Sequence, residues 1–195
     1  MNKKRTRIAA LCMVLAIPLV LGFGSKVSKN PIVVMETNKG DVVIELFKKE
    51  APITVKNFLT YIDDKYYNNT IFHRVIPGFM IQGGGFNASL ESKPTKQAIK
   101  NEATNQVSNK RGTIAMARTG VIDSATSQFF INVVNNNSLD HRDTSRQGFG
   151  YCVFGKVISG MQVVDQIVNA PTTRQNYHLN VPIEPIIIKT IRRMK

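Results

Sequence analysis

Residues 72–85 read Phe-His-Arg-Val-Ile-Pro-Gly-Phe-Met-Ile-Gln-Gly-Gly-Gly, and no other stretch constrains the fold as strongly. Two short apolar runs meet at Pro77-Gly78, a dipeptide that is typical of turns. The pattern therefore predicts a strand over Ile71–Ile76, a tight turn, and a second strand over Phe79–Gln82.

Alternation along these two strands predicts which side chains share a face. It places Phe72 with Arg74 on one side of the first strand, and Met80 with Gln82 on one side of the second. A guanidinium beside apolar side chains can bind a carbonyl group with little competition from water. The glycines that follow lack the Gly-Lys-Ser/Thr of a phosphate-binding loop, which argues against a nucleotide site.

The first 24 residues are typical of a secretory signal peptide. A basic start precedes the uncharged stretch Ile8–Leu21, and small residues follow up to Gly24, which matches the signal-peptide order. We expect cleavage after Gly24, then a linker over residues 25–30 and one domain over residues 31–195. The alternative is an uncleaved membrane anchor, although a span needs about 17–25 apolar residues.

Charge and cysteine content narrow the function classes. The chain has 195 residues and a net charge of +13, and removal of residues 1–24 takes away four Lys and Arg side chains. The remaining charges are scattered along the chain, so we expect no nucleic-acid binding. The mature chain keeps only Cys152, which excludes an intramolecular disulfide and suits a small core residue.

The rest of the chain alternates strand-like and helix-like patterns. Apolar residues recur at helical spacing after Pro52 and again over Gly160–Asn169, whereas Ala170–Pro185 reads as an irregular loop. Further strands are expected at Ile32–Thr37, Asp41–Phe47, Gly112–Ala117, Phe129–Val133, Tyr151–Val157 and Ile186–Ile191. Eight strands with two separated helices suggest an all-β, closed antiparallel barrel, although periodicity alone leaves a sandwich open.

The stretch over residues 72–85 resembles the signature of the cyclophilins, the peptidyl-prolyl cis/trans isomerases. The resemblance covers about Pro31–Arg193 and implies a closed eight-stranded β-barrel capped by two α-helices. The matching signature residues are Phe72, His73, Arg74, Ile76, Pro77, Gly78, Phe79, Met80, Gln82, Gly83 and Gly84. Matches downstream are Met116-Ala117, Ser127–Ile131, Leu139-Asp140 and Val153–Val157.

The resemblance also implies a substrate groove. Arg74 would be the catalytic residue, and four apolar residues would hold the proline ring: Phe79, Met80, Phe130 and Leu139. The family assigns hydrogen bonds with the substrate backbone to Gln82 and Gln128, and places Ala117 along the groove. Plain core packing is the alternative for the apolar members.

Three positions depart from the eukaryotic pattern of the family. Ser138 stands where those proteins have tryptophan, Arg118 where they have asparagine and Tyr151 where they have histidine. The segments around Arg118 and Tyr151 instead resemble the secreted bacterial branch. We count both residues as substrate-binding, and we expect only weak cyclosporin binding.

The expected function is isomerisation of Xaa-Pro bonds in the periplasm, where it would assist the folding of exported polypeptides. Such a reaction needs no cofactor and no metal. The alternative is a proline-peptide-binding or chaperone module that has kept the groove and lost turnover. The sequence shows no oligomerisation motif, so we expect a monomer without stable membrane association after cleavage.

Overall fold

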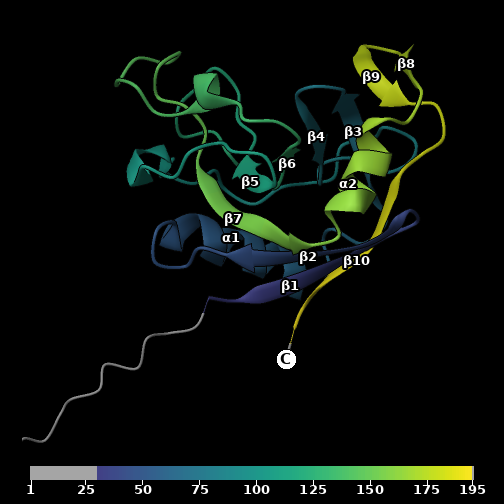
Figure 1. The fold of residues 1–195 in the computed structure, drawn as a ribbon, viewed down its shortest axis with the longest axis horizontal. Coiled ribbons are helices and arrows are strands. Elements are labelled where there is room, and N and C mark those ends of the chain that lie inside the picture. Colours follow the sequence, from purple (N-terminus) through teal and green to yellow (C-terminus); the bar gives the residue numbers. More distant parts are fainter. Residues whose placement is uncertain (1–29, 195) are drawn as a thin grey trace, which may run out of the picture.

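The computed structural model describes residues 30–194. Within them, eight antiparallel strands close into a barrel in the order β1-β10-β3-β4-β6-β5-β7-β2, and Figure 1 labels these strands. The barrel strands are β1 (Ile32–Thr37), β2 (Gly40–Leu46), β3 (Thr70–Ile76), β4 (Met80–Gly83), β5 (Thr113–Met116), β6 (Phe129–Asn132), β7 (Val153–Ser159) and β10 (Ile187–Arg193). The closed antiparallel barrel that the sequence predicted is therefore confirmed. The expected signal peptide and most of the linker lie outside the described residues.

Two helices complete the barrel, α1 (Pro52–Asp63) and α2 (Met161–Val168), and they lie well apart in Figure 1. The apolar face predicted for α1 is buried in the core, where the Phe58 ring lies 5.1 Å from the rings of both Tyr67 and Phe154. Pro52 opens this helix without losing a helical hydrogen bond. No helix within residues 30–194 is long and apolar enough to cross a membrane.

The segment 170–185 is not the irregular loop that the sequence suggested. It contains a hairpin of β8 (Thr172–Gln175) and β9 (His178–Pro182), which stands beside β3 and α2 in Figure 1. Its turn uses Asn176 at a φ of 51°, a backbone conformation that asparagine tolerates. Val181 is the main apolar residue that the hairpin buries, so the alternation that reveals a strand is missing.

A register shift in β3 separates two residues that alternation had placed together. Phe72 pairs with Gly83 and Arg74 with Gln82, so β3 advances two residues while β4 advances one. Such a bulge resets the alternation of side chains. Phe72 enters the barrel core, whereas Arg74 is exposed on the outer wall. The expectation that Phe72 and Arg74 share a face is wrong, and that for Met80 and Gln82 is confirmed by their common cavity.

His73, the residue at this shift, is buried beneath the hairpin. It is 5% exposed, its ring lies 4.6 Å from that of Phe86 and 6.4 Å from that of His178, and its Nδ1 has no hydrogen-bond partner among the described residues. Burial, with smaller contributions from His178 and Arg74, lowers the pKa of His73 from 6.5 to about 4. The imidazole is therefore neutral in the folded protein at neutral pH.

The low pKa of His73 predicts acid destabilisation. Between pH 6.5 and about 4 the unfolded chain binds a proton at His73 and the folded chain does not, so the free energy of unfolding falls as the pH falls. The loss should approach roughly 3 kcal/mol at pH 4, from the size of the shift. Urea unfolding of the wild type and His73→Phe across this range measures it. The same dependence of the unfolding free energy on pH in both proteins would contradict the prediction.

Candidate functional site

A cavity of about 160 Å³ opens on the outer wall of the barrel, and it collects nine of the ten site residues expected from the sequence. Its lining is Arg74, Phe79, Met80, Gln82, Ala117, Arg118, Phe130, Leu139 and Tyr151. The tenth residue, Gln128, lines an adjoining cavity and is hydrogen-bonded to Gln82. Three strands and the connections β3–β4, β5–β6 and β6–β7 therefore meet at one place.

The floor of this cavity is apolar and separate from the barrel core. Met80 and Phe130 are 2% and 4% exposed and pack with Ala115 and Val153 in a second apolar cluster. Pairing across β4, β6 and β5 aligns these residues on the outer face, since Gln82 pairs with Phe130 and Phe130 with Ala115. The half-buried Phe79 and Leu139 form its rim.

One wall of the cavity is a chain of hydrogen bonds that begins at Arg74. The Nη1 of Arg74 donates to Oε1 of Gln82 over 3.3 Å, and Nε2 of Gln82 donates to Oε1 of Gln128 over 2.9 Å. The amide of Gln82 is thereby fixed in orientation from both sides. Within the described residues this is the one hydrogen bond that Arg74 donates from its side chain, and its other donors remain available to a ligand.

Arg118 and Tyr151 form another part of the cavity lining. The guanidinium of Arg118 donates to the carbonyl oxygens of Gly150 (3.0 Å), Thr119 (2.9 Å) and Arg146 (2.8 Å). Its Cζ lies 4.8 Å from the centre of the Tyr151 ring, within the range of a cation–π interaction. The Tyr151 ring in turn meets Phe130 edge to face at 5.7 Å.

A buried amide network that the sequence did not predict supports the groove. The Nδ2 of Asn136 donates to the carbonyl of Phe79 (2.9 Å) and to Oδ1 of Asn132 (2.7 Å), and Nδ2 of Asn132 donates to Oγ1 of Thr113 (2.9 Å). These bonds fix the backbone that carries the Phe79 ring. Asn132 falls inside the predicted strand Phe129–Val133, and a buried amide in an apolar strand implies partners. The presence of Asn132 in this apolar strand was therefore the sequence signal that could have indicated the network.

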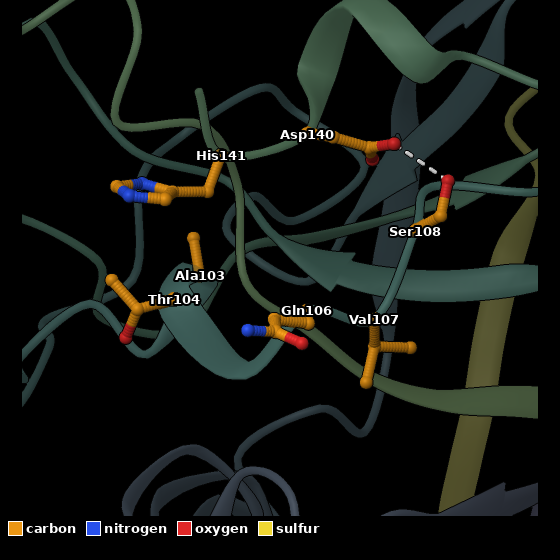
Figure 2. Close-up of a pocket in the computed structure, with 7 residues that line it drawn as sticks. All are labelled: Ala103, Thr104, Gln106, Val107, Ser108, Asp140 and His141. Carbon is orange, nitrogen blue, oxygen red and sulfur yellow. Dashed lines mark hydrogen bonds between the residues drawn. The ribbon is translucent and has the colours of Figure 1, made fainter. Parts of the chain in front are cut away.

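Asp140 also acts on the groove from behind, and Figure 2 shows its carboxylate directed at Ser108. It accepts hydrogen bonds from Oγ of Ser108 (2.6 Å) and from the backbone N–H of Asn109 (2.7 Å). Burial raises the pKa of Asp140, but these hydrogen bonds outweigh that effect and leave the pKa below its ordinary value. The carboxylate thus anchors the loop that carries Leu139.

Asp140 and His141 line a second cavity of about 290 Å³ between this loop and residues 103–108. In Figure 2 the imidazole of His141 points away from Asp140, and its Nδ1 lies 2.9 Å from the carbonyl oxygen of Phe149. The carboxylate in this cavity, that of Asp140, is already hydrogen-bonded to Ser108 and Asn109. The arrangement able to grip an apolar ring beside a fixed cation is the groove at Arg74.

Comparison with known proteins assigns this arrangement to a family. Residues 32–193 match the family model described as cyclophilin type peptidyl-prolyl cis-trans isomerase. A peptidyl-prolyl cis-trans isomerase of Acinetobacter baylyi is 55% identical over 84% of this chain and 85% of its own. Peptidyl-prolyl cis-trans isomerase B of Escherichia coli is 56% identical over 82% of this chain and 98% of its own.

A solved structure agrees with these relatives. The crystal structure of a cyclophilin type isomerase of Cryptosporidium parvum in the presence of the dipeptide Ala-Pro superposes with a TM-score of 0.72. The two proteins are 32% identical, and the match covers 84% of this chain and 99% of the other.

Proposed function

This chain belongs to the cyclophilin-type peptidyl-prolyl cis-trans isomerases, and from that premise we propose that the outer groove is where it rotates Xaa-Pro bonds. The observation that carries the proposal is the exposed guanidinium of Arg74 at the edge of an apolar cavity. A proline ring fits against Phe79, Met80, Phe130 and Leu139 there. Gln82 and Gln128 offer hydrogen bonds to the polypeptide backbone beside it.

To catalyse this rotation, the groove must bind the twisted Xaa-Pro bond more strongly than the planar one. An Xaa-Pro bond is planar by resonance, and its uncatalysed rotation takes tens to hundreds of seconds. Twisting localises a lone pair on the proline nitrogen. A fixed cationic donor directed at that nitrogen binds the twisted state more strongly than either planar state, which is catalysis by differential binding. Arg74 can do this without transferring a proton, and no covalent intermediate is needed.

Exchange NMR on an Ala-Pro peptide, with and without the protein, tests this assignment. We expect faster cis/trans exchange, together with chemical-shift changes that centre on Phe79, Phe130 and Leu139. Binding at the groove without faster exchange would instead favour the alternative of a binding or chaperone module. Shift changes confined to another surface would remove the groove from the reaction.

We further propose that the protein is exported and acts on proline-containing polypeptides in the periplasm. The support is the order of basic, apolar and small residues over the first 24 positions. The intact mass of the exported protein is the test, and a mature chain that begins at Ser25 is the expected result. A chain that retains Met1 and sediments with the membrane fraction would show an anchor instead.

Ser138 underlies a prediction of weak inhibition by cyclosporin. In the family a tryptophan at this position helps to hold that cyclic peptide, whereas this chain has no tryptophan and the side chain of Ser138 is exposed beside Leu139. An aromatic hot spot contributes about 2 kcal/mol or more to binding, so Ser138→Trp should tighten inhibition by roughly 30-fold or more. Turnover of a small peptide should change much less, because Ser138 does not line the cavity.

Inhibition curves for the wild type and Ser138→Trp against one peptide substrate measure this effect. Nanomolar inhibition of the wild type would contradict it, and so would unchanged inhibition of the variant.

A further inference from the structure

The cavity next to the proline groove is polar and has one fixed positive charge. It measures about 150 Å³ and shares Gln82, Ala117 and Arg118 with the groove. Its remaining lining consists of hydroxyl and amide side chains, namely Thr119, Ser124, Thr126 and Gln128. Among residues 30–194, no carboxylate lines either cavity. A substrate side chain that enters here therefore meets a cation with no acidic neighbour in the lining.

The cation in this cavity is held in place before any ligand arrives. Three of the five N–H groups of Arg118 donate to backbone carbonyls, and its guanidinium stacks on Tyr151. Two N–H groups remain for a ligand. Because the side chain is already ordered by these contacts, binding an anion costs little further conformational entropy.

The hydroxyl side chains that line this cavity beside Arg118 are fixed as well. The hydroxyl of Ser124 accepts hydrogen bonds from the backbone N–H and the hydroxyl of Thr119, and it donates to the carbonyl of Val121 over 2.7 Å. Asp123 is the one acid in the loop of residues 117–128. It accepts a hydrogen bond from the backbone N–H of Asn101 over 2.8 Å and does not line the cavity.

The path of a bound polypeptide follows from the position of Arg74. If its guanidinium faces the proline nitrogen, the preceding residue lies on the Arg74 side of the ring, because that nitrogen is bonded to the preceding carbonyl carbon. The next group along this wall is Gln82, which is hydrogen-bonded to both Arg74 and Gln128. The chain on the N-terminal side of the proline would then run toward the adjoining cavity of about 150 Å³.

From this arrangement we propose that Arg118 is a specificity-determining residue, which selects substrates that carry a carboxylate side chain two residues before the proline. The inference rests on the proposed use of the groove and adds a substrate preference to it. A glutamate there can take the two free N–H groups of Arg118, whereas a lysine is repelled by the same charge.

The test compares acetylated peptides Zaa-Ala-Pro-Phe in which Zaa is Glu, Gln or Lys. For the wild type at low salt, kcat/KM from exchange NMR should be about three- to fivefold higher for Glu than for Gln, the scale of a partly exposed ion pair. The ratio should fall in 0.5 M salt because the charges are then screened. Moving the glutamate to the position after proline should remove the preference.

Two variants separate specificity from a structural role. Arg118→Gln should bring the Glu-to-Gln ratio close to one, and Arg118→Glu should make the Lys peptide the preferred one. If Arg118 acts only through its hydrogen bonds to Gly150 and Arg146, these variants should slow all three peptides equally and leave the Glu-to-Gln ratio unchanged. Lys189→Gln, which removes an exposed cation of β10 outside both cavities, is the charge-matched control and should keep the wild-type ratio.

The outcomes distinguish this inference from the function on which it rests. Equal turnover of the Glu and Gln peptides by the wild type would overturn the role of Arg118 and leave isomerisation intact, and so would an unchanged ratio in Arg118→Gln. A wild-type protein that accelerated none of the three peptides would overturn the proposed function and this inference together.

Discussion

Arg74→Ala is expected to lower kcat/KM for Xaa-Pro isomerisation by about 10²–10³, the scale of losing one transition-state donor. The guanidinium is the charged donor that β3 directs to the edge of the apolar cavity, and Gln82 holds it there. The other cation of the groove, Arg118, is bound to three backbone carbonyl groups and cannot replace it. The measurement is exchange NMR on a single peptide at several enzyme concentrations.

The fold should survive this substitution. Arg74 is exposed and, in the part of the chain that the structure describes, makes one side-chain hydrogen bond, at 3.3 Å, so the urea midpoint should change little. Arg74→Lys is the matched variant, because it keeps the charge and loses the planar fork of donors. Its activity should lie between those of the wild type and Arg74→Ala. Near-normal turnover by Arg74→Ala would exclude Arg74 from the mechanism, and an unfolded variant would show a structural role.

Gly150→Ala should reduce both stability and turnover. Gly150 has a φ of 77°, and a Cβ there would lie 2.7 Å from three backbone atoms: the carbonyl carbon of Asp140, the nitrogen of His141 and the oxygen of Leu139. Backbone cannot rotate away as a side chain can, so the Leu139 loop must move. Displacement of a substrate-positioning group by about 1 Å can cost roughly 10²-fold in rate. We expect a loss of that order in kcat/KM, measured together with the urea midpoint.

Gly112→Ala is the control for backbone strain alone. Gly112 has a similar φ of 84°, but the nearest atom to its added Cβ is Sδ of Met161 at an ordinary 3.5 Å. A left-handed conformation costs a non-glycine residue about 1–2 kcal/mol, so both variants should lose some stability. Only Gly150→Ala should lose most of its turnover. Equal turnover by the two variants would show that the Leu139 loop does not depend on this contact.

Local patterns in the sequence were sufficient for most of the barrel. Pro77-Gly78 marked the turn between β3 and β4, and helical spacing of Val55, Phe58 and Ile62 identified the buried face of α1. These signals are local because turn chemistry and apolar periodicity depend on residues a few positions apart. The ten site residues came from the family resemblance, since they belong to segments spread over residues 74–151 and no local pattern connects them.

Contacts between distant segments decided the rest. The register shift at His73 sends Phe72 inward and Arg74 outward, and it depends on how β3 pairs with β4. The β8–β9 hairpin forms from polar residues because it packs on the barrel beside β3. The partners of the Asn132 and Asn136 amides, Thr113 and the carbonyl of Phe79, lie far away in the sequence and are brought to them by the fold. The sequence by itself determined the approximate positions of the eight barrel strands and the two helices, because these depend on local conformational preference. Register, burial and the shape of the groove were decided only by the tertiary structure, because each depends on partners that the chain brings together when the barrel closes.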